Sequence, residues 1–432
     1  MRNVAFYLNN IGIESIDCRN LANSNPGIGG SEYAILSIAH SLSVRKNALN
    51  VILFTERKGL FPKEICCNII NTIENAILSS IKKKVDYFLV DHKRIPKELI
   101  SKYPTVKFVI WAHNFMNESD LEFYYNAANV IRIINVGREQ RDLHRDHKIA
   151  YKLDYIYNAL SLSSIKKYNV SSYPFQKRKN NVIYMGSIVP SKGFHLLAQA
   201  WPNILKKVPD AQLFILGSGK LYDRKLKLGK WGIAEKDYEN KFMKFLVEDN
   251  KIHPSVHFMG VLGEEKNNLL LKCKVGVPNP SGISETFGFT SIEMQAMGCN
   301  VTTIKCPGYL DTVFNKNNLY QSASSLTNQI TKLLIEQSNE YKDVLAFIKS
   351  NFSFEVILLQ WEELFLKSLD QNYLIQNYKE IHNPEFRLKF IKEFLRKIKS
   401  KYNFLKNIIT MEYILVRSYD KIIEKWKKVN KL

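Results

Sequence analysis

Short apolar runs recur through the first part of the chain, and more polar segments separate them. The runs are NVAFYL (3–8), NVILFT (50–55), YFLVDH (87–92), KFVIWAH (107–113), VIRIINV (130–136) and LDYIYN (153–158). Several are continuously apolar and rich in Val and Ile, which is typical of parallel strands covered on both faces. The segment SEYAILSIAHSL (31–42) between the first two has helical character. This alternation predicts an open parallel sheet with right-handed helical crossovers.

A polar segment then separates two similar patterns. Residues 161–180 are rich in Ser, Lys and Asn, and we expect them to form a linker. The strand pattern restarts with NVIYMG (181–186), AQLFILG (211–217), VHFMG (256–260), VGVPNP (275–280) and NVTTI (300–304). A chain of 432 residues is also too long for one compact core. We therefore predict two α/β domains, residues 1–165 and 175–350, with a cleft between them.

The rest of the chain is expected to be helical. The segment 351–369 has apolar residues at helical spacing around Trp361, and we predict a crossing helix over 351–375. Residues 376–432 lose the strand pattern and predict one or two basic helices. Their apolar stripe is Phe390, Ile391, Phe394, Leu395 and Ile398.

Charge is the unusual feature of the composition. The net charge is +21, from 62 Lys and Arg against 41 Asp and Glu. From Lys379 onward there are 15 basic and 6 acidic residues, so the C-terminal extension supplies 15 − 6 = 9 of the excess. Such an excess favours a polyanionic partner such as nucleic acid, an anionic membrane face or a phosphorylated substrate. For the extension, two interpretations stay open: a solvated helical hairpin packed on the protein, or attachment to an anionic membrane surface.

Other sequence features bear on where the protein works. No uninterrupted apolar run reaches about 18 residues, so no spanning helix is predicted. The N-terminal residues lack the features of a signal peptide. The six cysteines form no CxxC pair, so neither a zinc site nor a disulfide framework is indicated. We expect a cytoplasmic protein, with peripheral attachment to the inner membrane face as the alternative.

Four glycine-marked turns border the predicted strands. They are PGIGGSEYA (26–34), YMGSIVPSKGF (184–194), ILGSGK (215–220) and SETFGFTSIE (284–293). A helix N-terminus offers unpaired amides, and glycine lets an anion approach the backbone closely. Because open α/β sheets bind ligands where strand ends border a cleft, the four turns together predict a phosphate-binding site.

The last of these turns carries two acids. Glu285 and Glu293 lie 293 − 285 = 8 positions apart, on either side of a Phe-Gly-Phe sequence. If a helix starts there, the backbone amides of residues 287–290 would face a phosphate and Glu285 would flank it. Glu293, about a turn and a half into the helix, would reach another part of the same ligand. Since a carboxylate can accept two hydrogen bonds from a vicinal diol, the pattern predicts a nucleotide-sugar as ligand.

At these residues the chain resembles the retaining glycosyltransferases of GT-B architecture, above all family 4. Their signature is a glutamate, seven residues and a second glutamate, with Phe-Gly between, as in Glu285 to Glu293. The resemblance covers most of residues 1–370 and includes GGSE (29–32), WAHN (111–114) and the crossing helix around Trp361. It implies two Rossmann-like, doubly wound α/β domains facing a cleft, here with a C-terminal helical extension.

The resemblance also implies roles for individual residues. Glu293 would hold the nucleotide ribose, and Glu285 would contact the donor sugar. Lys192 would neutralise the diphosphate, Gly30 would offer its amide to the same group, and His113 would face the reactive side of the sugar. The donor site would further include these turn and helix-entry residues: Gly29, Ser187, Gly217, Phe287, Gly288, Phe289 and Thr290.

One position departs from the family pattern. The family usually has an arginine where this chain has Ser187. Lys192 must then serve alone, or another basic residue must replace the arginine. Removing a preorganised charge from a leaving group costs on the order of 10²–10³ in rate. The chain has no DxD sequence, which argues for a metal-independent reaction, and no cofactor is expected.

The expected activity is therefore that of a retaining hexosyltransferase. It would move a sugar from a nucleoside-diphosphate-sugar to a hydroxyl group of a glycan or a lipid-linked acceptor, as in polysaccharide biosynthesis. A nucleotide-sugar epimerase or a phosphorylase-like enzyme of the same architecture is the first alternative. A basic nucleic-acid-binding protein is a weaker one, because no nucleic-acid motif is recognisable and the paired glutamates would have no role.

Overall fold

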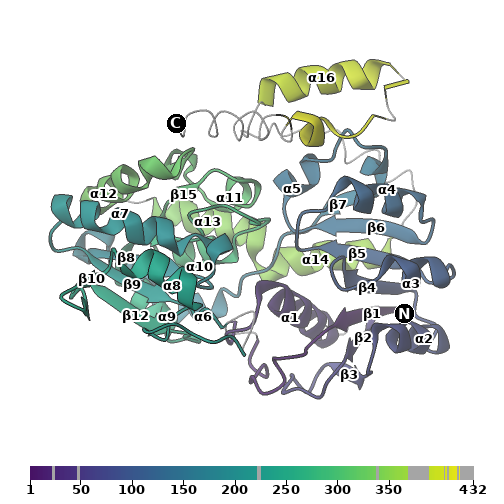
Figure 1. The fold of residues 1–432 in the computed structure, drawn as a ribbon. Coiled ribbons are helices and arrows are strands. Elements are labelled where there is room, and N and C mark those ends of the chain that lie inside the picture. Colours follow the sequence, from purple (N-terminus) through teal and green to yellow (C-terminus); the bar gives the residue numbers. More distant parts are fainter. Residues whose placement is uncertain are drawn as a thin grey trace.

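The computed structural model describes residues 1–21, 25–45, 49–220, 225–336, 340–367, 389–402, 404–405, 408–415 and 418. Within them, two parallel sheets flanked by helices lie side by side, one from each half of the chain (Figure 1). This arrangement confirms the predicted fold class, a mixed α/β protein with two doubly wound domains.

The N-terminal sheet has seven parallel strands in the described part of the chain, in the order β3-β2-β1-β4-β5-β6-β7. Every residue of β4 and β5 is buried, as the continuously apolar runs predicted. The strand order changes direction between β1 and β4, which is where open α/β sheets form a ligand crevice. The strands are β1 (Arg2–Leu8), β2 (Leu49–Thr55), β3 (Cys66–Ile69), β4 (Tyr87–Asp91), β5 (Phe108–Ala112), β6 (Val130–Asn135) and β7 (Leu153–Tyr155).

The second sheet is smaller and, over the same described residues, has the order β12-β9-β8-β13-β14. The strand order changes direction between β8 and β13, so the loops after these two strands border the crevice of this sheet. The strands are β8 (Lys179–Met185), β9 (Gln212–Leu216), β12 (Val256–Gly260), β13 (Cys273–Val277) and β14 (Asn300–Val301). Two short pairs accompany it: β10 (Val247–Glu248) with β11 (Lys251–Ile252), and β15 (Thr303–Ile304) with β16 (Leu319–Tyr320).

Helices connect the strands and cover the sheets. Those of the N-terminal half are α1 (Gly30–Val44), α2 (Ile73–Lys82), α3 (Lys97–Lys102), α4 (Glu118–Asn126) and α5 (Arg138–Asp142). Those of the second half are α7 (Phe194–Lys207), α8 (Lys236–Met243), α9 (Lys266–Leu270), α10 (Phe289–Ala296), α11 (Pro307–Thr312), α12 (Leu326–Ile335) and α13 (Tyr341–Phe352). The expected linker contains a short helix, α6 (Ser163–Lys166), and buries Ile165, Val170 and Phe175 among otherwise polar residues.

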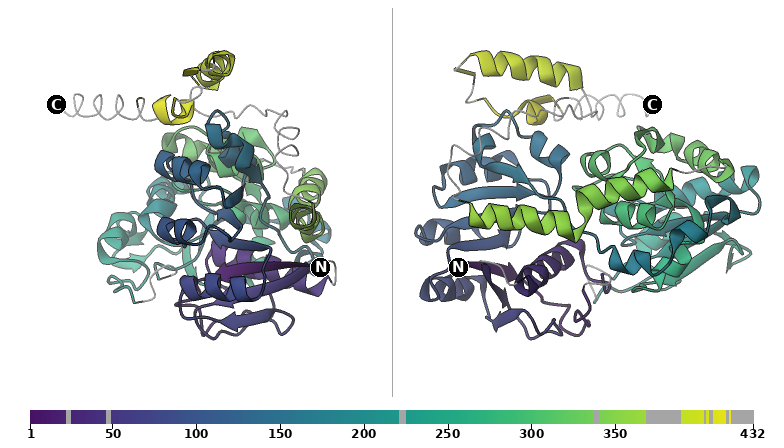
Figure 2. Two further views of the ribbon diagram at one scale, coloured as in Figure 1. Left: turned by 90° about the vertical axis from the view of Figure 1, so that its right-hand side faces the viewer. Right: turned by 180° about the vertical axis from the view of Figure 1, so that it is seen from behind.

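A helix at the end of the second half returns to the first. Helix α14 (Phe354–Leu366) follows α13 directly and packs beside the N-terminal sheet (Figure 2). Its fully buried Trp361 meets Trp111 of β5 with ring centroids 4.6 Å apart. Arg2 of β1 donates a hydrogen bond to the carbonyl oxygen of Phe365 at 2.8 Å. This packing ties the two halves together and holds the pocket between them.

Helix α16 (Lys389–Lys401) is the described core of the basic extension and lies over the N-terminal half, near α4 and α5 (Figure 1). Much of the rest of the predicted extension, including residues 376–388 and 419–432, lies outside the described residues. Among the residues described, no helix is long and apolar enough to cross a membrane.

Candidate donor-binding site

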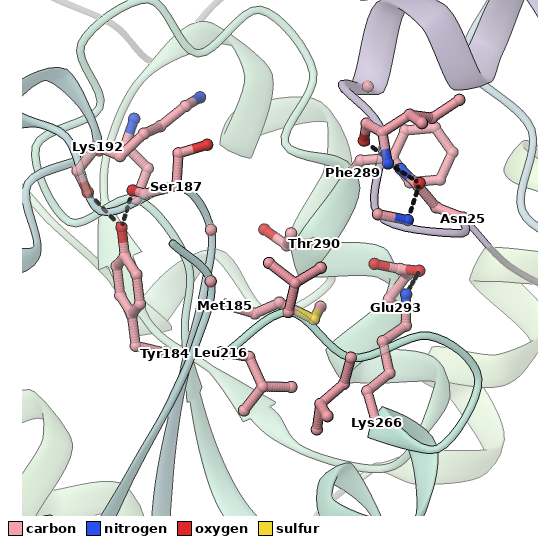
Figure 3. A pocket seen from close by; sticks show the side chains of 18 of the residues that line it. Asn25, Tyr184, Met185, Ser187, Lys192, Leu216, Lys266, Phe289, Thr290 and Glu293 are labelled. Atoms are coloured by element: carbon pink, nitrogen blue, oxygen red, sulfur yellow. Dashed lines mark hydrogen bonds and ion pairs between the residues drawn. The ribbon is translucent and has the colours of Figure 1, made fainter. Parts of the chain in front are cut away.

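A pocket of about 210 Å³ lies where the two halves meet, and both halves line it. The N-terminal half contributes the turn before α1, including Asn25, Gly27 and Gly30. The second half contributes the turns after β8 and β9 and the start of α10. In Figure 3, Lys192 and Ser187 stand on one side of the pocket, and Lys266 with Glu293 stands on the other. The pocket therefore joins the glycine-marked turns that the sequence singled out.

Glu285 reaches the pocket from a tightly organised loop after β13. The Asn279 side chain donates to the carbonyl oxygen of Ile283 at 3.1 Å and to Glu285 Oε2 at 3.1 Å. Its Oδ1 accepts hydrogen bonds from the amide and the hydroxyl group of Ser281. Ser284 adopts a positive φ of 59°, which is unusual for a residue other than glycine. One buried asparagine thus shapes the loop and orients the first glutamate.

Lys192 is held close to this loop by a glycine. Gly193 has a φ of +66°, and a Cβ atom there would lie 2.7 Å from the backbone nitrogen of Ser281. Glycine therefore allows the turn after β8 to approach the Asn279 loop, and Ser281 Oγ donates to the carbonyl oxygen of Ser191 at 2.8 Å. In this arrangement Lys192 Nζ lies 2.9 Å from Glu285 Oε2. Both side chains are largely buried, so this end of the pocket carries one cation and one anion in contact.

Glu293 forms a second ion pair at the other end of the pocket. Helix α10 begins at Phe289 after Gly288, which has a φ of +82°, and Glu293 is its fifth residue. Glu293 Oε1 lies 2.7 Å from Lys266 Nζ, and the two side chains are 13% and 7% exposed. Lys266 is the first residue of α9, and no motif in the sequence marks it as a site residue. Because burying a charge is costly unless it is paired, this contact offsets the cost of placing either side chain at the pocket wall.

The N-terminal half reaches the pocket through a close contact between α1 and α10. The Tyr33 and Phe289 rings meet edge to face with centroids 5.5 Å apart. In the preceding turn, Asn25 Oδ1 accepts hydrogen bonds from the amides of Gly27 and Ile28. A Cβ at Gly27 would lie 2.8 Å from a methyl group of Val261, so this turn touches the opposite half. Gly30, in contrast, has open space where a side chain would be.

His113 sits at the end of β5 but is not among the residues lining the pocket. It is 7% exposed, and its Nδ1 lies 2.9 Å from Asp91 Oδ2 at the end of the neighbouring strand β4. Burial raises the pKa of the Asp91 carboxyl, but the hydrogen bond and charge of His113 outweigh this, so the pKa lies below its usual value. Among the described residues, His113 Nε2 has no hydrogen-bond partner. The His113 carbonyl oxygen accepts from Thr286 Oγ1 at 2.6 Å, which joins β5 to the glutamate loop.

Eight of the residues predicted from sequence line the pocket together: Gly30, Ser187, Lys192, Gly217, Glu285, Phe289, Thr290 and Glu293. Gly29, Phe287, Gly288 and His113 are not among its lining residues. Phe287 packs against Tyr157 and Phe352 in an aromatic cluster. A Cβ at Gly288 would lie 2.5 Å from the Tyr309 ring, so that position needs a glycine for packing. The roles expected for all twelve in binding stay predictions.

The position of the missing arginine is occupied by a small buried side chain. Ser187 is 2% exposed, and its Oγ has no hydrogen-bond partner among the described residues. In the described chain, the basic side chains that line the pocket are those of Lys192 and Lys266. Sequence reasoning missed Lys266 and also Asn279 and Asp91. Of these, only Asp91 had a local signal, as an acid that ends an apolar strand.

Comparisons with known proteins bear on the family and the fold. The family described as "Glycosyl transferases group 1" matches residues 166–349, which include the glutamate motif. An uncharacterized glycosyltransferase of Haemophilus influenzae is 20% identical over 397 residues, covering 84% of this chain and 99% of its own. Together with the solved structures below, the family match supports a glycosyltransferase with the GT-B fold.

Two solved structures resemble the whole fold. A glycosyltransferase from Rickettsia africae superposes with a TM-score of 0.63 at 16% identity, covering 87% of this chain and 99% of its own. HepE of Anabaena, solved in complex with UDP, gives a TM-score of 0.59 at 16% identity, with 84% and 99% covered. Both are similar to this chain in its two Rossmann-like domains, which is the architecture that the resemblance implied.

Proposed function

We propose that the protein is a retaining glycosyltransferase that uses a UDP-sugar without a metal ion. It transfers the sugar to a hydroxyl group of a glycan or of a lipid-linked acceptor. The observation that carries this proposal is the interdomain pocket with an ion pair at each end, Lys192 with Glu285 and Lys266 with Glu293. The choice of UDP is supported by HepE, which was solved with UDP and has the same fold.

The two ends of the pocket suit different parts of such a donor. Glu293 uses Oε1 for Lys266, so Oε2 can accept hydrogen bonds from the ribose hydroxyls. Glu285 receives both Lys192 and Asn279 on Oε2, so Oε1 can accept from a hydroxyl of the sugar. The diphosphate then lies between them, beside Lys192 and the start of α10, whose amides and dipole favour an anion.

The reaction proposed is a displacement on one face of the sugar. The bond between the anomeric carbon and the β-phosphate oxygen breaks, and the bond to the acceptor oxygen forms on the same face. The acceptor proton passes to the departing β-phosphate, whose negative charge Lys192 stabilises. Asp91 holds Nδ1 of His113, so the ring is fixed and Nε2 can bond a sugar hydroxyl on the side of the N-terminal half. Both glutamates serve binding in this scheme, and neither acts as a nucleophile.

Binding and turnover test the proposal separately. A thermal-shift screen of nucleoside diphosphates should show stabilisation by UDP, because a ligand at about 100 times its Kd adds about 2.7 kcal/mol to the folded state. Incubation with UDP-sugars should then release UDP, and EDTA should leave the rate unchanged. The anomeric configuration of the product, read by NMR, should match that of the donor.

Three results would contradict parts of this proposal. Inversion at the anomeric carbon would exclude the same-face displacement, and loss of activity in EDTA would exclude metal independence. Conversion of a UDP-sugar into an epimer, without release of UDP, would identify the first alternative instead.

A further inference from the structure

The C-terminal helix α16 is amphipathic, and its basic side faces the protein. Lys392, Arg396 and Lys399 follow one another at spacings of four and three, which places them on one face of a helix. Their side chains are only 1%, 6% and 3% exposed. The sequence left open whether this basic helix packs on the protein or attaches to an anionic membrane surface. The structure turns that face inward.

Ion pairs with Asp146 of the underlying protein and with Glu412 of the extension itself explain this orientation. Asp146, after α5, receives Arg396 Nε at 3.0 Å and Lys399 Nζ at 3.1 Å, and Arg396 also donates to the carbonyl oxygen of Leu143. Lys392 pairs with Glu412 at 2.6 Å. Burial raises the pKa of the Asp146 carboxyl, but the charges of Arg396 and Lys399 outweigh this and lower it below its usual value. These buried pairs fix which side of the helix points away from the protein.

Exposed apolar and aromatic side chains lie on α16 and in the segment that follows it. On α16, Ile391 is 50% exposed and Phe394 is 63% exposed. In the segment that follows, Tyr402 is 45% exposed and Phe404 is 76% exposed. The helix forms the outermost layer over the N-terminal half in all three ribbon views (Figures 1 and 2). Tyr402 and Phe404 lie together, with ring centroids 6.0 Å apart, and large exposed apolar side chains that gather on a surface mark interaction sites.

The charge on this outward side has one sign. Lys397 and Lys401 are exposed beside Phe394 on α16. The acids of the described extension, Glu393 and Glu412, are both engaged in ion pairs with Arg145, Arg396 or Lys392. The surface is therefore apolar with a positive rim. A second copy would bring the same positive rim and be repelled, whereas an anionic lipid surface attracts lysines and accepts apolar side chains.

We propose that this outer face, formed by Ile391, Phe394, Tyr402 and Phe404, inserts into the interface of an anionic membrane. The side chains enter the boundary between headgroups and acyl chains, and Lys397 and Lys401 remain at headgroup level. Three of the basic residues of α16, Lys392, Arg396 and Lys399, instead hold the helix in place through buried ion pairs. Asp146, which holds α16, follows α5, and α5 contacts the second half where the Glu139 amide donates to Asp311 Oδ2 at 3.0 Å. The membrane would therefore border the cleft between the two halves.

Vesicle sedimentation with the full chain tests this proposal without any donor. The probe is a set of vesicles of phosphatidylcholine, with and without phosphatidylglycerol, at low and high salt. The wild type should sediment with the anionic vesicles and retain part of its binding in high salt, since apolar insertion is not screened. The double variant Phe394→Ser and Phe404→Ser should bind at least tenfold more weakly. The matched control is Ile69→Ser with Leu359→Ser, at residues 54% and 56% exposed elsewhere, and should bind as the wild type does.

Each outcome bears on the proposal. Equal binding of the wild type and the Phe394 and Phe404 variant would overturn it, and so would absence of wild-type binding to anionic vesicles. A dimer seen by light scattering without vesicles, and lost in the variant, would assign the face to a second copy instead. UDP affinity of the variant should equal that of the wild type, so a failure here is distinct from a failure of the proposed function.

Discussion

Replacing Glu293 with glutamine should weaken UDP binding about thirtyfold while leaving the protein folded. Glutamine keeps the shape of the side chain, and its carbonyl oxygen can still accept from Lys266 Nζ, which now lies 2.7 Å from Glu293 Oε1. The second oxygen becomes an NH2 group, which donates instead of accepting, so the ribose keeps only neutral hydrogen bonds in which its hydroxyls accept. A hydrogen bond to a charged group contributes about 1.5–3 kcal/mol and a neutral one about 0.5–1.5 kcal/mol, so each bond to the ribose loses about 1 kcal/mol. Two such bonds amount to about 2 kcal/mol, and 1.4 kcal/mol is tenfold in affinity.

Calorimetric titration of the full chain measures this difference. UDP and inorganic diphosphate are titrated into the wild type and into Glu293→Gln, because diphosphate lacks the ribose and should bind both proteins equally. The matched control is Glu336→Gln, which removes an acid that pairs with Lys332 at 3.5 Å on α12, outside the pocket. This control should leave both affinities unchanged.

Two results would refute the reasoning. If folded Glu293→Gln bound UDP within about twofold of the wild type, Glu293 would not hold the ribose. If diphosphate binding fell as much as UDP binding, the effect would come from the changed charge of the pocket as a whole.

Three further predictions follow from the contacts described above. Lys192→Gln should lower kcat by about 10²–10³ in a UDP-sugar turnover assay, because the leaving diphosphate loses its cation. The control Lys207→Gln, at an exposed position, should leave kcat unchanged. Equal rates for wild type and Lys192→Gln would exclude Lys192 from the reaction. Burial, together with the negative charges of Asp311 and Asp142, raises the pKa of Glu139 to about 8. The stability that its protonated form contributes is therefore present below its unfolded pKa and is lost as pH rises through about 8. Glu139→Gln should therefore raise the thermal midpoint relative to wild type more at pH 8.5 than at pH 5, and a difference independent of pH would contradict the shift. Trp361→Ala should cost about 3–5 kcal/mol in urea unfolding, since it empties a buried site against Trp111. A loss below about 1 kcal/mol would contradict the tight packing of Trp361 in this site.

Much of the fold could be predicted from the pattern of apolar runs. Strands such as β4 and β5 are buried on both faces, so they must be apolar throughout, and that requirement is visible in the sequence. Strand β3 was not predicted, because its residues, CCNI, are mostly exposed at the sheet edge and carry no such pattern. The segment 161–180 looked like a linker because its three buried apolar residues are scattered among polar ones.

For the site, the parts that are local in the chain could be recognised without the structure. Glu285, the glycine turn and Glu293 are close in sequence, and Gly30, Ser187, Lys192 and Gly217 stand in turns that glycine makes recognisable. Which distant side chains complete them depends on how the chain folds. Lys266 reaches Glu293 from another helix, and Asp91 reaches His113 from a neighbouring strand.

Helix α16 likewise combines a feature that is local in the chain with one that depends on a distant residue. Its sequence determined an amphipathic helix, because helical periodicity depends only on spacing. Which face points outward was decided by Asp146, which lies 250 positions before Arg396 in the chain and pairs with it. A long-range ion pair leaves no periodic trace in the sequence, since its energy depends on the distance between two charges and not on their separation along the chain.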